Sequence, residues 1–191
     1  VILFNHRHDV FLHLIFIITF YAIACVITRK NMLTMLKNEL PGYATALGTQ
    51  SSAATIPVNL KCAEKNGVSA DISAFVIPLG ANIHMPGSMI TIVSIALATM
   101  MMFSKEYDFR MFMTFIAVLG FVTIAAPGAP GGSIMSAIPF IGILGLSSTG
   151  PIASLLIVLY ITQDSFGTAC NVACDTALAM IIDKISNAIR Q

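Results

Sequence analysis

The chain is short of charge and contains no tryptophan. Ten of its 191 residues are Lys or Arg and nine are Asp or Glu, which is 10% of the chain, whereas 57% of the residues are hydrophobic. Because soluble domains carry about 25% charged residues, this composition excludes an ordinary soluble domain. The net charge of +1, with no basic patch interleaved with aromatic residues, gives no reason to expect a nucleic-acid partner. The composition indicates an all-α membrane protein in a lipid bilayer.

The usual motifs of redox proteins and enzymes are absent too. The four cysteines form no CxxC pair, so no disulfide framework is expected. Cys170 and Cys174 stand four residues apart, and we interpret them as small buried residues instead of a metal pair with His84. There is no GxSxG, HExxH or phosphate-cradling loop, and we therefore expect neither an enzyme nor an organic cofactor.

An intramembrane hydrolase is the alternative from another class of function. It would use Ser51 or Ser52 with His84, or Asp164 and Asp175 as a catalytic dyad. Aspartates eleven residues apart on one helix lie ~16 Å apart along its axis, which is too far to share a proton. The spacing therefore argues against the dyad.

Three segments, two of them uncharged, are predicted to be long enough to cross a bilayer. Residues 10–28 form a run that just spans a hydrocarbon core of ~30 Å, and His13 near one end is predicted to reach the membrane interface. Residues 72–104 are longer than one crossing needs and contain Pro78 and Pro86, so we predict a broken helix with an unwound centre over 82–88. The last crossing helix is predicted over residues 151–189.

Two further segments are too short to cross the membrane and return as full helices. Residues 32–66 centre on GTQSSAATIP at 48–57, and residues 110–146 centre on PGAPGGS at 127–133. Each predicts a re-entrant helical hairpin with a small-residue tip, which must pack inside protein because irregular backbone is not tolerated against lipid. A hairpin followed by a crossing helix is predicted twice, and the second unit has the opposite orientation in the membrane. This arrangement is an inverted repeat of the kind found in secondary transporters.

Four polar side chains share one stripe of the last helix. Their spacing of i, i+4, i+7 and i+11 places them within about 60° of one another. A carboxylate in these surroundings costs at least ~2.5–3.5 kcal/mol, so the aspartates are expected to have partners. Oxygen-rich side chains suit a hard cation or a ligand amino group. The four residues are Asp164, Thr168, Asn171 and Asp175.

The basic residues predict an orientation. Loops at one end carry seven of them and the other end carries three, which favours the first end, with the C-terminus, as cytoplasmic in a plasma (inner) membrane. The seven are Arg29, Lys30, Lys37, Lys61, Lys65, Lys184 and Arg190, and the three are Arg7, Lys105 and Arg110.

Four motifs in order resemble one family. They are GTQSSAATIP, PLGANIHMPGS at 78–88, PGAPGGS, and QDSFGTACNVACD at 163–175. The chain resembles the C-terminal half of the dicarboxylate/amino acid:cation (sodium) symporter family over residues 10–190. The resemblance implies a sodium-coupled elevator-type transporter and a homotrimer. The chain opens with Val1 and not Met, and residues 1–191 would be a partial transport domain that lacks the N-terminal scaffold.

The resemblance also implies roles for individual residues. Sodium ions would be held by side chains and backbone carbonyls at Gly80, Asn82, His84, Asn171 and Asp175. The substrate would contact Ser51, Ser52, Ser88, Gly128, Ala129, Pro130, Gly131, Asp164, Gly167, Thr168 and Asn171, with Asp164 on its ammonium group and residues 128–131 as the gate.

Three departures from the family pattern set the specificity that we expect. Gly167 stands where acidic-substrate members carry an arginine, so a second substrate carboxylate would lack a guanidinium partner and a small neutral amino acid is favoured. Pro86 replaces an aspartate of the third sodium site. His84 replaces an asparagine and is either a proton carrier or a hydrogen-bonded neutral imidazole. Proton-coupled transport and transport of a dicarboxylate or acidic amino acid stay open as alternatives.

Overall fold

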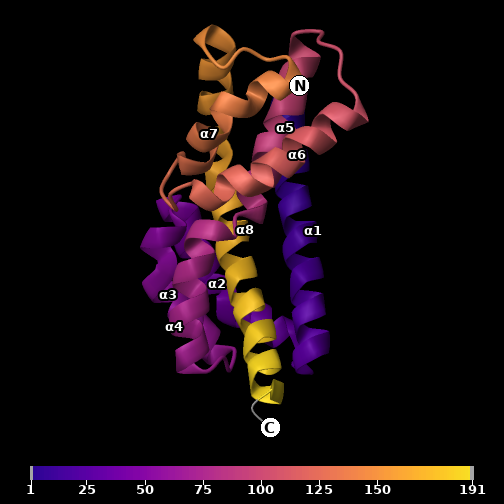
Figure 1. The fold of residues 1–191 in the computed structure, drawn as a ribbon. Helices are drawn as coiled ribbons and strands as arrows, with labels where there is room; N and C mark the ends of the chain where they lie inside the picture. The colour runs from indigo at the N-terminus through magenta and orange to yellow at the C-terminus, as the bar shows by residue number, and fades with distance from the viewer. Residues whose placement is uncertain (1, 190–191) are drawn as a thin grey trace.

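The computed structural model describes residues 2–189, so Val1, Arg190 and Gln191 lie outside it. These residues form an all-helical bundle with no strand among them (Figure 1). Three helical units in the described part are long and apolar enough to cross a membrane: His6–Thr28, Ala70–Met102 and Gly150–Ile189. They correspond to the three crossing segments that the sequence predicts.

The first helix, α1, spans Ile2–Thr28 and extends beyond the uncharged run at its N-terminal side. The carboxylate of Asp9 lies inside the bundle and does not mark the end of the helix. His13 is also buried, so the prediction that it reaches the interface was wrong. The opposite face of α1 exposes large apolar side chains such as Phe11, Ile18 and Val26, as expected for a helix beside lipid or a further apolar segment.

A helical hairpin follows. Helix α2 spans Met32–Thr49 and α3 spans Ser52–Lys65, joined by Gln50 and Ser51, which we call the first tip. Gln50 takes a left-handed conformation with φ of 53°, and Ser51 Oγ caps α3 by accepting a hydrogen bond from Ala54 N at 3.1 Å. A left-handed residue followed by an N-cap reverses the chain within two residues.

The next unit is a helix interrupted near its middle. Helix α4 spans Ala70–Ile83 and α5 spans Pro86–Met102. The break consists of His84 and Met85, which is shorter than the predicted unwound segment 82–88. The helix resumes early because a proline is well tolerated in the first turn, where its missing N–H would have had no partner.

The second hairpin is less regular than the first. Helix α6 spans Phe109–Val122 and continues into the 3₁₀ turn η1, Thr123–Ala125. Residues 126–131, which we call the second tip, lead to the returning arm. That arm consists of the short α7, Gly132–Ala137, and the 3₁₀ helix η2, Ile138–Leu144. Pro139 removes a backbone donor at the start of η2, which accounts for the departure from a regular α-helix.

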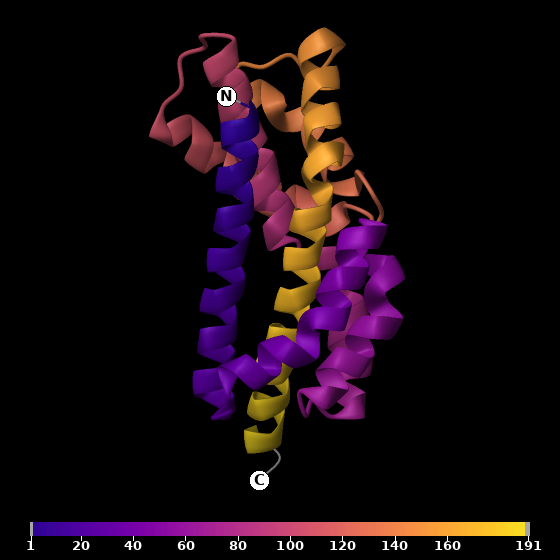
Figure 2. The same ribbon diagram turned by 180° about the vertical axis from the view of Figure 1, so that it is seen from behind.

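Helix α8, Gly150–Ile189, is 40 residues long and packs against most of the other helices. Figure 1 shows the α2–α3 hairpin beside one half of α8 and the α6–α7 hairpin beside the other half, and Figure 2 shows α1 running along both halves. Each half has its own apolar core, one around Tyr21 and Ile77 and the other around Phe115 and Ile95. The two tips therefore approach each other at the middle of α8.

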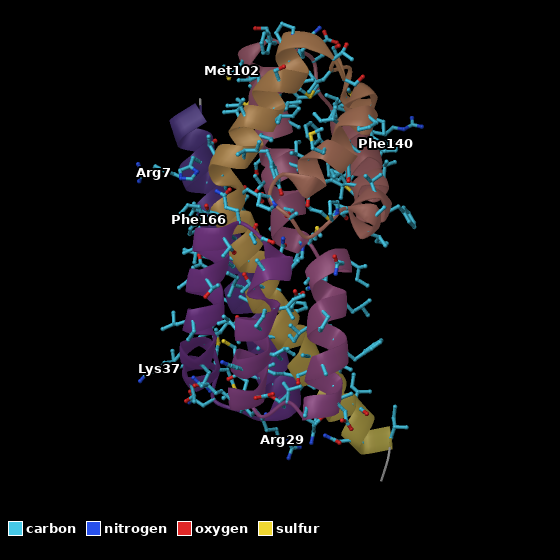
Figure 3. The ribbon with its side chains drawn as sticks, turned by 90° about the vertical axis from the view of Figure 1, so that its left-hand side faces the viewer. Arg7, Arg29, Lys37, Met102, Phe140 and Phe166 are labelled. Atoms are coloured by element: carbon cyan, nitrogen blue, oxygen red, sulfur yellow. The ribbon has the colours of Figure 1, made fainter. Side chains whose placement is uncertain are left out.

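Basic loops gather at the end of the bundle where α8 finishes. Lys30 Nζ donates to the carbonyl oxygen of Asn66, which joins the loops that follow α1 and α3. Ser69 N donates to Asp183 Oδ1 at 3.1 Å, which ties the loop before α4 to the last turns of α8. Figure 3 shows Arg29 and Lys37 at this end and Arg7 in the other half. The grouping on which the predicted orientation rests is thus present in space for the described residues.

Candidate functional site

The two hairpin tips are hydrogen-bonded to each other. Ala53 N, in the first turn of α3, donates to Gly128 O at 3.1 Å, and Ser51 Oγ donates to the same oxygen at 2.8 Å. A Cβ atom at Gly128 would lie 2.4 Å from Ala81 O, so only glycine allows the second tip to approach the end of α4 this closely. Both tips and the broken helix therefore meet at one place.

A small polar cavity lies at this meeting point. Its empty volume, including the mouth, is about 200 Å³. The walls come from both tips, from the start of α5 and α7, and from one face of α8. The lining residues are Gln50, Ser52, Met85, Ser88, Pro127, Gly128, Ala129, Ser133, Tyr160, Asp164, Thr168 and Asn171.

Asp164 is the one charged side chain among those lining residues. It is 2% exposed. Its Oδ2 accepts a hydrogen bond from Gly131 N in the second tip at 3.1 Å, and its Oδ1 accepts one from Thr168 Oγ1 at 3.2 Å. Two hydrogen bonds compensate a buried carboxylate only in part, so the charge also attracts a cationic ligand group. A carboxylate in this position can pair with a cationic ligand group beside the second tip.

Asn171 joins α8 to the start of α5. Its Oδ1 accepts hydrogen bonds from Gly87 N at 2.8 Å and Ser88 N at 3.4 Å, and its Nδ2 donates to Ser88 Oγ at 2.9 Å. The first N–H groups of a helix have no partner within the helix, and here a side chain from α8 supplies one. The break in the α4–α5 unit is thereby held against the cavity wall.

Asp175 lies further along α8, against the end of α4. His84 Nδ1 lies 2.8 Å from Asp175 Oδ1, while the buried Oδ2 has no hydrogen-bond partner. A Cβ atom at Gly80 would lie 2.6 Å from Asp175 Oδ1, so the glycine makes room for the carboxylate. An unpartnered buried carboxylate oxygen beside the end of a helix suits a hard cation such as sodium.

The predicted sodium ligands are thus brought together in part. Gly80, His84 and Asp175 form one group, and Asn171 lies one helical turn away on α8. The side chain of Asn82 is exposed and donates to Pro78 O of its own helix at 2.9 Å, so the ligand predicted at this position would be its backbone carbonyl. Next to it, the carbonyl of Ala81 faces Gly128 of the second tip.

Several predicted substrate residues lie beside the cavity instead of lining it. The hydroxyl of Ser51 is bonded to Gly128, Gly131 acts through its backbone N–H, and Pro130 is exposed. Gly167 packs against α5, where a Cβ atom would lie 3.1 Å from Thr91 Oγ1 and 3.4 Å from the carbonyl of Gly87. The resemblance put Gly167 among the substrate contacts, but in the structure this position faces the α5–α8 contact.

The sequence analysis missed five lining residues: Gln50, Met85, Pro127, Ser133 and Tyr160. Tyr160 had a signal, since it stands four residues before Asp164 on the same stripe of α8. Pro127 and Ser133 are the two ends of the PGAPGGS segment. Gln50 Nε2 donates to Ser165 Oγ at 2.8 Å, and this contact between the first tip and α8 had no local signal.

Comparison with known proteins identifies the family. A model of the sodium:dicarboxylate symporter family matches residues 9–185. The chain is 32% identical over 166 residues to the serine/threonine transporter SstT of Acinetobacter baylyi, covering 86% of this chain and 42% of that protein. It is 30% identical over 162 residues to human excitatory amino acid transporter 1, covering 84% of this chain and 30% of that protein. The chain thus spans less than half the length of these relatives. With a match that extends over most of its residues, the chain belongs to the sodium:dicarboxylate symporter family.

Proposed function

We propose that the parent protein is a secondary active transporter that moves a small neutral amino acid across the plasma membrane together with sodium. The observation that carries this proposal is the buried carboxylate of Asp164, held between two mutually bonded hairpin tips. The chain would form part of a moving, elevator-type transport domain with re-entrant hairpins. The scaffold would be supplied by a preceding segment, and three copies would assemble as a homotrimer.

The substrate class follows from the charge and size of the cavity. An α-ammonium group would pair with Asp164, and an α-carboxylate would accept hydrogen bonds from Ser52 and Asn171. No Lys or Arg is among the lining residues, so a second substrate carboxylate would have no cationic partner. The cavity is much smaller than the ~300–1,000 Å³ of most small-molecule pockets, which favours a small side chain. One of the relatives is named as a serine/threonine transporter.

Sodium would travel as a second substrate. Asp175 Oδ2 lacks a partner, Gly80 of α4 packs against this carboxylate, and Asn171 stands one helical turn before Asp175 on α8. Oxygen ligands of this kind suit a hard monovalent cation. The imidazole of His84 on Asp175 Oδ1 makes a proton the competing occupant, and proton-coupled transport is the alternative that this contact favours.

Gating would use the hydrogen bonds between the tips. Opening the second tip breaks the contacts of Gly128 with Ser51 and Ala53, and also that of Gly131 with Asp164. An ammonium group on Asp164 neutralises a carboxylate that the second tip also contacts, so an occupied cavity stabilises the closed tip. The end of the bundle with Arg29, Lys37 and the C-terminus of α8 would face the cytoplasm.

The test is uptake by the full-length parent in proteoliposomes. Serine, threonine, alanine and aspartate are each offered with an inward sodium gradient, with a proton gradient, and with neither. The proposal expects sodium-driven uptake of a neutral amino acid that Asp164→Asn strongly reduces. Uptake that does not depend on sodium would show that sodium is not the coupling ion. Preference for aspartate would show that the substrate is not a neutral amino acid.

A further inference from the structure

A second buried polar cluster lies behind the cavity wall, between α1 and α5. It consists of Asp9, His13 and Thr91, of which the aspartate and the histidine are each 1% exposed. Thr91 Oγ1 donates to Asp9 Oδ2 at 3.0 Å, and His13 Nδ1 lies 3.9 Å from the same oxygen. Neither Asp9 Oδ1 nor His13 Nδ1 has a hydrogen-bond partner. None of the three residues lines the cavity.

One residue connects this cluster to the proposed substrate site. His13 Nε2 lies 3.0 Å from the carbonyl oxygen of Gly87, and because a carbonyl only accepts, the imidazole carries its proton on Nε2. The N–H of the same glycine donates to Asn171 Oδ1 at 2.8 Å. A Cβ atom at Gly87 would lie 2.2 Å from Gly167 O, so the glycine is wedged against α8. A change in the bonding of His13 therefore reaches Asn171 through a single, tightly packed residue.

The number of protons held by Asp9 and His13 follows from the net charge that each protonation state would bury. One shared proton gives either a carboxylic acid beside a neutral imidazole or a carboxylate beside an imidazolium, and both arrangements have zero net charge. Removing that proton to water leaves a net negative charge in a buried place, and adding a second leaves a net positive charge. Uncompensated charge at this depth is costly, so the singly protonated pair is the stable form.

The surroundings favour a proton over a metal cation. The imidazole occupies the space between Asp9 and the Gly87 carbonyl, whereas sodium prefers an all-oxygen shell. Helix α5 contributes only hydroxyl groups, from Thr91 and from Ser94 near the carboxylate. Helix α8 contributes the thiol of Cys170, which donates to His13 O at 3.9 Å.

The remaining titratable groups near the pair are on α1 itself. His6 also acts on Asp9, and its ring packs edge-on against Phe166 of α8 at 5.6 Å. Arg7 is exposed and points away from the bundle (Figure 3). Among the described residues near Asp9, no Lys or Arg side chain competes with His13 for the carboxylate.

We infer that Asp9 and His13 form a proton-binding site whose occupancy controls amino acid binding through Gly87. With the proton present, an imidazolium forms an ion pair with Asp9 across 3.9 Å and donates a hydrogen bond to the Gly87 carbonyl. Without it, the single imidazole proton is drawn to the carboxylate, which is the stronger acceptor, and Gly87 O loses its donor. Amino acid binding therefore weakens as the pH rises. The use of amino acid binding as a readout rests on the proposed function, whereas the proton-binding site is defined by Asp9, His13 and Thr91 alone.

The experiment measures amino acid affinity against pH with the full-length parent in nanodiscs. Binding is followed by calorimetry at saturating sodium over about pH 5.5–9, a range that covers imidazole titration. For the wild type, Kd rises with pH by up to about tenfold per unit, as expected for one linked proton. In His13→Gln, whose amide keeps a donor for Gly87 O, and in Asp9→Asn, binding is retained and the slope is lost.

Two controls separate a titrating role from a structural one. Thr91→Val removes a hydrogen bond to Asp9 but neither titratable group, and it keeps the slope. His6→Gln removes the other imidazole that acts on Asp9, and it keeps the slope as well. A slope that survives His13→Gln, or that disappears in His6→Gln alone, overturns the inference.

A second readout needs no amino acid. Infrared difference spectra between acid and alkaline pH show a carboxyl or imidazole band in the wild type that is missing from both Asp9→Asn and His13→Gln. Spectra in which both variants keep every wild-type band overturn the proton site. If these bands behave as expected but no amino acid binds the wild type, the site stands and the proposed transport function fails.

Discussion

Ser51 Oγ and the carbonyl oxygen of Gly128 are hydrogen-bonded at 2.8 Å, although the two residues are 77 positions apart in the chain. This bond and the one from Ala53 N to the same oxygen hold the two tips together over the cavity. Ser51 also caps α3 by accepting from Ala54 N. A single hydroxyl thus connects the local order of the first hairpin to the closure of the site.

Removing that hydroxyl is expected to weaken ligand retention. We predict that Ser51→Ala raises the Kd for the amino acid by about threefold to tenfold, the range given by one lost hydrogen bond. Ser51→Thr is the matched control because it keeps a hydroxyl that is able to cap α3 and contact Gly128. Calorimetric titration of the full-length parent measures both, and equal affinities in the two variants would contradict a role for the hydroxyl.

Asp164 is expected to account for most of the affinity for an ammonium group. Asp164→Asn keeps the side-chain volume but removes the charge, so Kd should rise by about tenfold to a hundredfold, as for loss of a charge-assisted hydrogen bond. Thr168→Val serves as the companion variant, since it removes the hydroxyl that donates to Asp164 Oδ1 but leaves the carboxylate charge in place. A larger loss from the threonine variant than from the aspartate variant would argue against an ammonium partner.

The sequence predicted the helical units well because apolar runs and prolines are local signals. The uncharged runs located the long helices, and the stripe on α8 put Asp164 and Asn171 on the face that lines the cavity. The returning arm of the second hairpin was expected to be a regular helix, and Pro139 was not given enough weight against its apolar composition.

The contacts between distant segments could not be predicted from the sequence. Asp9 looked like the boundary of an apolar run and His13 like an interfacial residue, because their partner Thr91 lies 82 and 78 positions away. Gly167 was placed by resemblance to a motif, whereas its actual neighbours depend on how α5 is seated on α8. The position of one packed helix along another depends on many side chains at once, and no single motif determines it.

His84 is expected to set the affinity for sodium. Its imidazole bonds Asp175 Oδ1 and so competes with a cation for that carboxylate. His84→Asn leaves the backbone carbonyls in place but removes the ring, and we predict half-maximal amino acid binding at a lower sodium concentration than in the wild type. Sodium titration of amino acid binding measures this value. An unchanged or higher sodium requirement would show that the Asp175 carboxylate is not the cation site.

Gly42 is expected to be essential for packing of the first hairpin. A Cβ atom there would lie 2.5 Å from Glu39 Oε1 and 3.3 Å from Asn59 Oδ1, and Glu39 is itself buried with both carboxylate oxygens unpartnered. Gly42→Ala should therefore destabilise the fold by about 1–3 kcal/mol, as overpacking of a tight core does. Gly48→Ala in the same helix meets no atom within 4 Å and should stabilise by about 0.5–1 kcal/mol, since alanine is the better helix former. Thermal unfolding of the detergent-solubilised parent distinguishes the two, and a Gly42→Ala variant as stable as Gly48→Ala would mean that Glu39 moves aside without cost.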